Sequence, residues 1–242
     1  DTLYDSLDEK SPFPGLVAFD AARMAELVLD AAHAALAAAG NPTVAGVGIT
    51  NQRASTVVWE RATGRPVGPA LGWQDLRTVG ECITAKAEHG IQLAPNQSAT
   101  KIGWLLANSA AGRDPAELCF GTVDTWLAWV LSGGAVHVTD HSNAAVTGLY
   151  SVADGAWHAG ICEALGVPME LLPTIVDTSG VVAAATALPG APPIAALVGD
   201  QQASLAGQGC SEPGMAKITF GTGGMLDMCQ GTTVPADGGR HP

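Results

Sequence analysis

The sequence has few basic residues, few cysteines and no unbroken hydrophobic run long enough to cross a membrane. Its 11 Lys and Arg residues stand against 23 Asp and Glu residues, which gives a formal net charge of −12. A charge of this sign opposes binding to nucleic acid and to anionic membrane surfaces, because both are negatively charged. We therefore expect neither nucleic acid nor a membrane among its partners.

The five cysteines are an odd number and are scattered along the chain. They form no CxxC pair, and no histidine stands at the spacing of a zinc site. This pattern favours small buried thiols in a reducing compartment over a disulfide framework or a metal centre. The solitary His33 is likewise expected at the surface rather than as a ligand.

The most apolar stretch runs from Val181 to Gly199, and three prolines interrupt it: Pro189, Pro192 and Pro193. Proline breaks a helix, so this stretch predicts a loop that feeds a buried strand rather than a membrane span. The first residues are acidic and polar and lack the basic start and apolar centre of a targeting segment. We expect a cytoplasmic protein.

The length of 242 residues and the apolar fraction of 47% allow one large domain or two small ones around a sizeable core. A first helix is predicted from about 21 to 39, capped by Asp20 and ended by Gly40-Asn41-Pro42. Apolar residues at helical spacing predict its core-facing stripe: Met24, Leu27, Val28, Ala31, Ala35 and Leu36.

Short β-branched runs predict strands at 44–50, 56–59 and 70–73. Further helices are predicted at 77–89, 98–111, 123–131, 157–165 and 201–208, and a β-hairpin at 216–229. Strands followed by helices indicate an α/β sheet with mixed strand directions.

The stretch from Val198 to Leu226 combines two features of phosphoryl transfer. The apolar run 194–198 predicts a strand that delivers Asp200 to the start of a helix, and a glycine-rich turn follows at 221–224. A carboxylate at a strand end can accept a hydroxyl proton, and a glycine-rich turn can cradle phosphate with backbone N–H groups. Each feature alone also fits a simpler role, as a helix cap for Asp200 and as a hairpin turn for the glycines.

Four blocks surround these features and make the sequence resemble the FGGY carbohydrate kinases, most of all the glycerol kinases among them. The blocks are GITNQR with TVVWE (48–60), LGWQDLRT (71–78), FGTVDTWLAW with HVTDHSNAA (120–145), and GDQQ followed by GMAKITFGTG (199–223). They occur in the order of the family and together are far more specific than one glycine motif.

The resemblance implies an α/β fold of the actin-like, ribonuclease-H-like ATPase type, in which two domains flank a cleft. Residues 1–242 would then form most of the N-terminal, polyol-binding domain. The resemblance also implies that the sequence starts after the family's first phosphate-loop hairpin and ends before its nucleotide-binding domain. On this basis we expect no phosphoryl transfer from residues 1–242 alone.

The resemblance also assigns roles to residues of the site. It implies ATP and Mg²⁺ as cofactors, Asp200 as the catalytic base and a contact to Mg²⁺, and Gly221, Thr222 and Gly223 as the phosphate loop. Arg53, Trp73 and Gln201 match positions that contact the polyol. Their chemistry suits that role, since they offer a guanidinium fork, an aromatic face and an amide.

Three positions in the expected pocket depart from the glycerol kinases: Ala54 replaces Glu, Asn96 replaces Tyr and Met225 replaces Phe. Two lost polar partners at about 1–3 kcal/mol each would weaken glycerol binding by roughly two to four orders of magnitude. The expected pocket is therefore wider and less polar than a glycerol site. Glycerol remains the first candidate, and a larger polyol, a ketose and a non-catalytic polyol-binding module are the alternatives. The sequence leaves the oligomeric state open, a homo-oligomer included.

Overall fold

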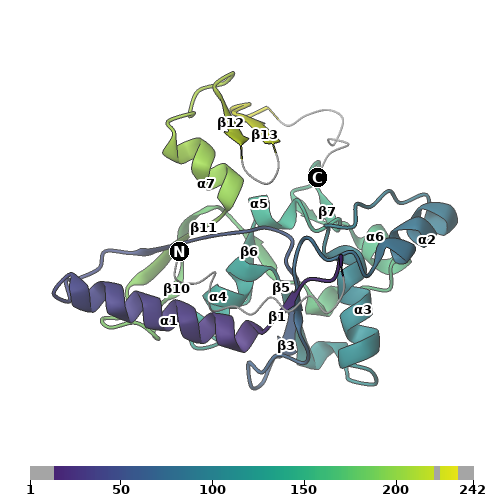
Figure 1. Cartoon of the computed structure of the whole chain (residues 1–242), viewed down its shortest axis with the longest axis horizontal. Coiled ribbons are helices and arrows are strands. Elements are labelled where there is room, and N and C mark those ends of the chain that lie inside the picture. Colours follow the sequence, from purple (N-terminus) through teal and green to yellow (C-terminus); the bar gives the residue numbers. More distant parts are fainter. Residues whose placement is uncertain (1–13, 221–223, 234–242) are drawn as a thin grey trace.

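A computed structural model of the chain describes residues 14–220 and 224–233 (Figure 1). Its central sheet has three strands in the order β10 (Ser179–Ala184), β11 (Pro193–Gly199) and β2 (Val47–Asn51). Strand β11 runs parallel to β2 and antiparallel to β10. The pairs Val198 with Thr50 and Gly199 with Asn51 bring the carboxyl ends of β2 and β11 to the same edge of the sheet. The segments that follow β2 and β11 therefore start close together in space.

Helix α1 (Ala21–Ala38) begins as predicted, with Asp20 as its N-cap. The Oδ1 atom of Asp20 accepts hydrogen bonds from Ala22 N at 2.9 Å and Arg23 N at 3.1 Å. The predicted core stripe is wrong in its second half, because Ala31 and Ala35 are exposed. The residues that pack on the core are Ala21, Met24, Ala25, Val28, Leu29 and Ala32. A helix this rich in alanine carries apolar residues on several faces, so spacing alone does not select the buried one.

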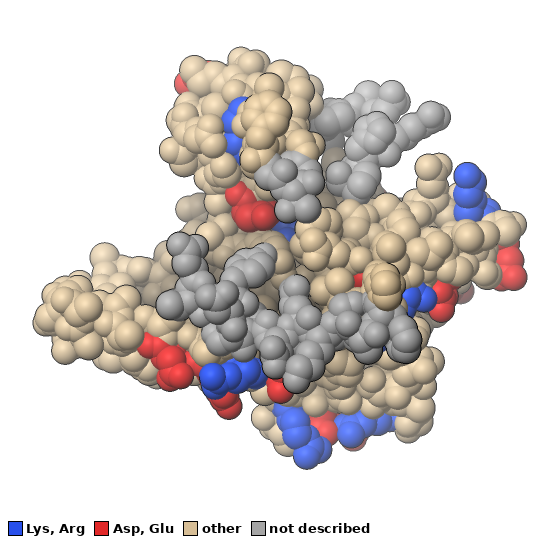
Figure 2. All heavy atoms as spheres, viewed as in Figure 1, with Lys and Arg blue, Asp and Glu red and all other residues tan. Residues whose placement is uncertain are grey.

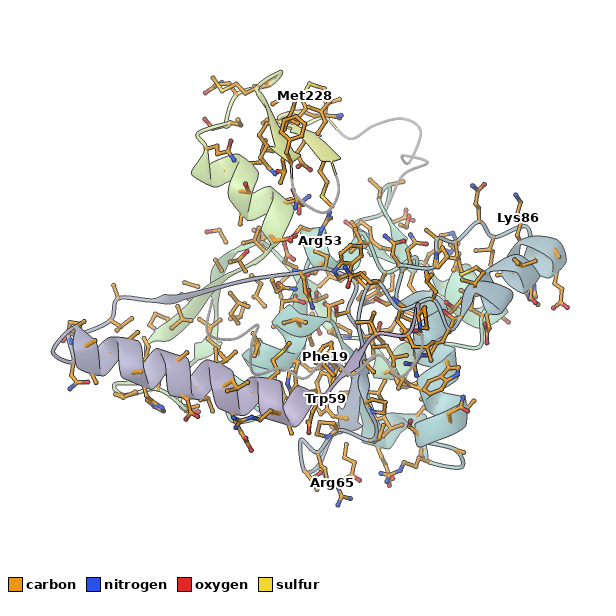
Figure 3. All side chains as sticks on the ribbon, viewed as in Figure 1. Phe19, Arg53, Trp59, Arg65, Lys86 and Met228 are labelled. Atoms are coloured by element: carbon orange, nitrogen blue, oxygen red, sulfur yellow. The ribbon has the colours of Figure 1, made fainter. Side chains whose placement is uncertain are left out.

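Two hydrophobic clusters lie on opposite faces of strand β3 (Val57–Glu60), which pairs antiparallel with β5 (Leu118–Gly121). Side chains alternate along a strand, so Trp59 enters one cluster and Val58 the other. The first cluster joins α1 to α4 (Val123–Leu131), and the second contains residues of α3 (Ala99–Ser109) and α6 (Ala159–Ala164). Figure 3 shows Phe19 near Trp59 in the first cluster.

Apart from helix α2, the remaining elements of the main body are short. They are β1 (Ala18–Phe19) paired with β4 (Ala70–Leu71), α2 (Val79–His89), β6 (Val138–Asp140) paired with β9 (Thr174–Val176), α5 (His141–Ala144), β7 (Tyr150–Ser151) paired with β8 (Ala156–Trp157), and the 3-10 turns η1 (Pro115–Glu117) and η2 (Met169–Leu171).

Helix α7 (Asp200–Gly207) and the hairpin of β12 (Ala216–Phe220) and β13 (Gly224–Met228) form a separate lobe above the main body (Figure 1). We call this the α7–hairpin lobe. In the hairpin, Lys217 lies opposite Asp227 and Thr219 lies opposite Met225. Both predicted elements, the helix and the hairpin, are confirmed.

The prediction for 181–199 is only half right. Strand β11 is confirmed, but Ser179–Ala184 is also a strand, β10, and not a loop. The prolines lie between the two strands or at the start of β11, where they interrupt no ladder already formed.

The described cysteines are all free. Cys82, Cys119 and Cys162 are buried, as expected, whereas Cys210 and Cys229 are partly exposed. His33 is exposed on α1, also as expected. Within the described residues no helix is both long enough and apolar enough to span a membrane.

One buried carboxylate lies in the core rather than at the sheet edge. Asp124, in the first turn of α4, is fully buried and accepts hydrogen bonds from the hydroxyls of Thr122 and Thr139. Burial raises the pKa of Asp124 to about 6, and these hydroxyls oppose the rise. Nearby, burial lowers the pKa of His137 to about 4.

Candidate active site

The candidate site begins where β2 and β11 end side by side. Arg53 follows β2, and Asp200 follows β11 as the first residue of α7. Gly199 occupies the N-cap position, and the Oδ1 atom of Asp200 accepts a hydrogen bond from Gln201 N at 2.8 Å. Asp200 is exposed at this point. Its carboxylate is therefore accessible at the point where the main body meets the α7–hairpin lobe.

The side chain of Arg53 lies in close contact with Gly199. A Cβ atom at Gly199 would lie 2.9 Å from Arg53 Cγ and 2.8 Å from Gln202 Oε1, and closer still to Arg53 Cδ. Only a residue without a side chain fits there while Arg53 keeps its position. The Nη1 atom of Arg53 donates to the carbonyl of Ser142 at 3.4 Å. Figure 3 shows Arg53 at the base of α7.

The charges around Arg53 are mostly acidic. Burial lowers the pKa of the Arg53 guanidinium from its ordinary value. The carboxylates of Asp200, Asp227 and Asp140 act in the opposite direction and favour its charged form. Figure 2 shows acidic and basic side chains meeting below the α7–hairpin lobe.

A hydrogen-bonded chain from Asp140 holds the two strand ends together. The Oγ atom of Ser142 donates to Asp140 Oδ2 at 2.7 Å and accepts from Gly199 N at 2.8 Å. The Nδ2 atom of Asn143 donates to Asp140 Oδ1, and Asn143 Oδ1 accepts from Asn51. Asp140 and Asn143 are fully buried. The positions of Arg53 and Asp200 are thus tied to one polar network beneath them.

Ala54 is buried and has a φ of 63°, in the left-handed region that most residues avoid. Its carbonyl accepts hydrogen bonds from Ser98 Oγ at 3.0 Å and from Thr56 Oγ1 at 3.2 Å. These two bonds hold the turn that follows Arg53.

Trp73 and Asn96 are brought together by Lys101, which sequence reasoning missed. Lys101 is fully buried, and its Nζ atom donates to the carbonyls of Gly72 at 2.8 Å, Trp73 at 3.2 Å and Asn96 at 3.3 Å. Burial lowers the pKa of Lys101 to about 8. A single lysine in a helical pattern is usually at the surface, so this role could not be predicted from the sequence.

On the opposite wall, Lys217 of β12 contacts three side chains. Its Nζ atom donates to Gln201 Oε1 and to Thr219 Oγ1, both at 2.8 Å. It also lies 3.0 Å from Asp227 Oδ2, in an ion pair without hydrogen-bond alignment. The Lys217 side chain is 1% exposed. The hairpin and α7 are joined at this point.

Residues of the main body and of the α7–hairpin lobe line an open pocket of about 480 Å³. Its lining includes all the predicted substrate-binding residues: Arg53, Ala54, Trp73, Asn96, Asp200, Gln201 and Met225. The lining also includes residues that sequence reasoning did not single out: Gln52, Val146, Gly224, Leu226 and Asp227. The predicted phosphate loop, Gly221, Thr222 and Gly223, lies outside the described residues. Within the described chain, no group of three or more His, Cys, Asp or Glu side chains could hold a metal ion.

Known proteins resemble this chain in both fold and sequence. The structure superposes on a glycerol kinase from Plasmodium falciparum, solved with ADP, with a TM-score of 0.83 and 27% identity, over 91% of this chain and 47% of that one. A xylulose kinase from Rhodospirillum rubrum gives a TM-score of 0.82 at 20% identity, over 91% of this chain and 48% of that one, and shows the fold alone. The fold is therefore that of the actin-like ATPases in their sugar-kinase form, which confirms the predicted fold class.

The sequence identifies the family. Residues 4–207 match the N-terminal domain of the FGGY family of carbohydrate kinases, and the chain belongs to that family. It is 45% identical to a glycerol kinase from Aromatoleum aromaticum, over 91% of this chain and 48% of that protein. It is 49% identical to one from Halorhodospira halophila, over 76% of this chain and 39% of that protein. The chain spans about half the length of the curated relatives it matches.

Proposed function

We propose that the protein transfers the γ-phosphate of ATP to a hydroxyl group of a small polyol, with glycerol as the first candidate. One observation carries this proposal: segments far apart in the sequence, 52–54, 73, 96, 200–201 and 224–227, line a single pocket that holds a carboxylate and a guanidinium. Phosphoryl transfer needs an alcohol in line with the phosphate, a proton acceptor and donors around the transferring oxygens. The kinase relatives supply the class of reaction.

In this proposal each residue has a distinct task. Asp200 accepts the proton of the attacking hydroxyl, and its exposed position leaves the carboxylate accessible to a ligand. Arg53 donates to neighbouring hydroxyls through its guanidinium fork. Trp73 gives an apolar face to the C–H groups of the polyol. The amide of Gln201 supplies a further polar contact.

We assign the phosphates of ATP to Gly221, Thr222 and Gly223, from the family resemblance. Asp200 also suits Mg²⁺, which is usually bound by one or two carboxylates together with waters and substrate phosphates rather than by a cage of protein ligands. Mg²⁺ would neutralise charge on the phosphates during transfer. We place the protein in the cytoplasm, where ATP is supplied.

The test is ADP release by the full-length protein with Mg²⁺ and ATP, across glycerol, erythritol, ribitol, xylulose and ribulose. Asp200→Asn should lower kcat by about 10²–10⁴ and keep polyol affinity within about tenfold, because Asn still forms hydrogen bonds. Asp30→Asn, an exposed carboxylate on α1, is the matched control and should change neither. Polyol binding without ADP release from the wild-type protein would indicate a non-catalytic binding module instead. An unchanged kcat in Asp200→Asn would remove Asp200 from the chemistry.

A larger polyol or a ketose is the second candidate substrate. Ala54, Asn96 and Met225 all line the pocket, as that alternative requires. Small or flexible side chains at these three positions leave room for a longer ligand. The substrate panel separates the two candidates directly.

A further inference from the structure

The pocket holds a carboxylate that the proposed reaction does not use, Asp227 on β13. Among the described residues that line the pocket, Asp200 and Asp227 are the two carboxylates. The Asp227 side chain is 21% exposed, and its Oδ2 atom, which faces Lys217, is covered. Because Oδ2 is covered, Oδ1 is the oxygen that would accept a hydrogen bond from a ligand.

Lys217 fixes the orientation of the neighbouring amide. An ammonium group only donates hydrogen bonds, so the atom of Gln201 at 2.8 Å from Lys217 Nζ has to be the amide oxygen. That oxygen is already engaged, which leaves the NH₂ group of Gln201 for a ligand. Gln201 thus acts in the pocket as a donor.

The pocket wall is consequently rich in donors. The side chains of Arg53 and Trp73 can only donate hydrogen bonds, and Gln201 presents its NH₂ group, which is also a donor. Every hydroxyl of a polyol brings one proton that needs an acceptor. In the proposed reaction Asp200 takes the proton of the reacting hydroxyl, so the next hydroxyl needs a second strong acceptor. Gln52 and Asn96 offer only neutral amides there.

We propose that Asp227 is a substrate-binding carboxylate that accepts a hydrogen bond from a polyol hydroxyl other than the one that is phosphorylated. This inference rests on the proposed function and deepens it. The glycerol kinases have a Glu at the position of Ala54, and Ala54 offers no side-chain acceptor. Asp227 would supply a charged acceptor from the hairpin instead. Lys217 is then a positioning residue, because it holds Asp227 and Gln201 at once.

The competing explanation is that Asp227 serves only as the counter-ion of buried Lys217. The two explanations predict different selectivity between ligands in Asp227 variants. Loss of a substrate contact changes the ratio of glycerol affinity to diol affinity, whereas loss of a counter-ion leaves that ratio unchanged. Equilibrium binding of glycerol, 1,2-propanediol and 1,3-propanediol to the full-length protein separates them, because each diol lacks one hydroxyl group. Asp227→Leu removes the acceptor, and Asp227→Asn is the milder variant if the first does not fold. Glu212→Gln, an exposed carboxylate shortly before the hairpin, is the matched control.

In the wild-type protein, the diol that lacks the hydroxyl bound by Asp227 should bind about 10–100-fold more weakly than glycerol, as expected for a hydrogen bond to a charged group. In Asp227→Leu that ratio should fall to about threefold or less, with an intermediate ratio in Asp227→Asn and no change in Glu212→Gln. Equal weakening of all three ligands in the Asp227 variants, with the ratio preserved, would overturn the inference and leave the proposed function intact. Failure of the wild-type protein to bind any of the three ligands would overturn the inference together with glycerol as the first candidate substrate, whereas the proposed phosphoryl transfer is tested separately by ADP release with the larger polyols.

Discussion

Replacing Gly199 by alanine should displace Arg53 from the pocket. The added Cβ would lie 2.9 Å from Arg53 Cγ and 2.8 Å from Gln202 Oε1, where ordinary contacts begin near 3.4 Å. Arg53 would have to withdraw by roughly half an ångström to 1 Å, and overpacking of this kind costs about 1–3 kcal/mol of stability. A misplacement of about 1 Å in a site can lower the rate by roughly 10²-fold.

The measurements are urea unfolding and kcat/KM of the full-length protein with its preferred polyol. Gly48→Ala is the matched control, because a Cβ on this glycine of β2 would meet only Ala196 Cβ at 3.9 Å. A double-mutant cycle with Arg53→Ala tests the cause, since the effect of Gly199→Ala on kcat/KM should largely vanish once the Arg53 side chain is gone. Full activity in Gly199→Ala, or an equal loss in the Arg53→Ala background, would refute the steric reasoning.

Three further predictions concern the pocket and the core. Lys101→Met should lower the free energy of unfolding by about 2 kcal/mol or more in urea titrations, because buried carbonyls lose their donor; an unchanged midpoint would contradict this. Ala54→Glu, Asn96→Tyr and Met225→Phe together should raise kcat/KM for glycerol relative to larger polyols by about 10²; an equal gain for every polyol would mean that these residues do not select the substrate. Burial raises the pKa of Asp124 to about 6, so the folded state keeps a proton that the unfolded state has lost, and stability falls as pH rises from about 4 to 6. Relative to Asp124→Asn, wild type should therefore lose up to about 3 kcal/mol across that range, measured by unfolding at each pH, and parallel pH profiles would contradict the assignment.

The elements that sequence reasoning located well are those with local signals. The cap at Asp20 and the helix 123–131 are determined by neighbouring residues, and both predictions are confirmed. Strands β5, β6 and β9 were missed, because each is only three or four residues long and is stabilised by a partner distant in the sequence. Local propensity carries little information about such pairings.

In the candidate site, too, sequence motifs located some residues, whereas residues that depend on tertiary partners were missed. Family motifs placed Arg53, Trp73 and Gln201 correctly on one pocket, although their roles stay predictions. Lys101 and Lys217 were missed, because a buried lysine differs from a surface lysine only through its tertiary partners. Their partners are backbone carbonyls in one case and two polar side chains with a carboxylate in the other. Neither set can be seen from sequence spacing.

Strand β13 has a consequence for how this pocket can be changed. Met225 and Asp227 alternate with Leu226 and Met228, and Leu226 and Met228 are 69% and 53% exposed. Figure 3 shows Met228 at the end of the hairpin away from Arg53. Leu226 also lines the pocket, so a library that varies positions 225 to 227 would change this wall of the pocket while Met228 stays constant. Insertion or deletion of one residue would change more, because a shift by one position exchanges the two faces of the strand and replaces the carboxylate opposite Lys217 with a thioether or an aliphatic side chain. Point substitutions, rather than changes of length, are thus the way to vary this wall of the pocket and keep the register of the hairpin.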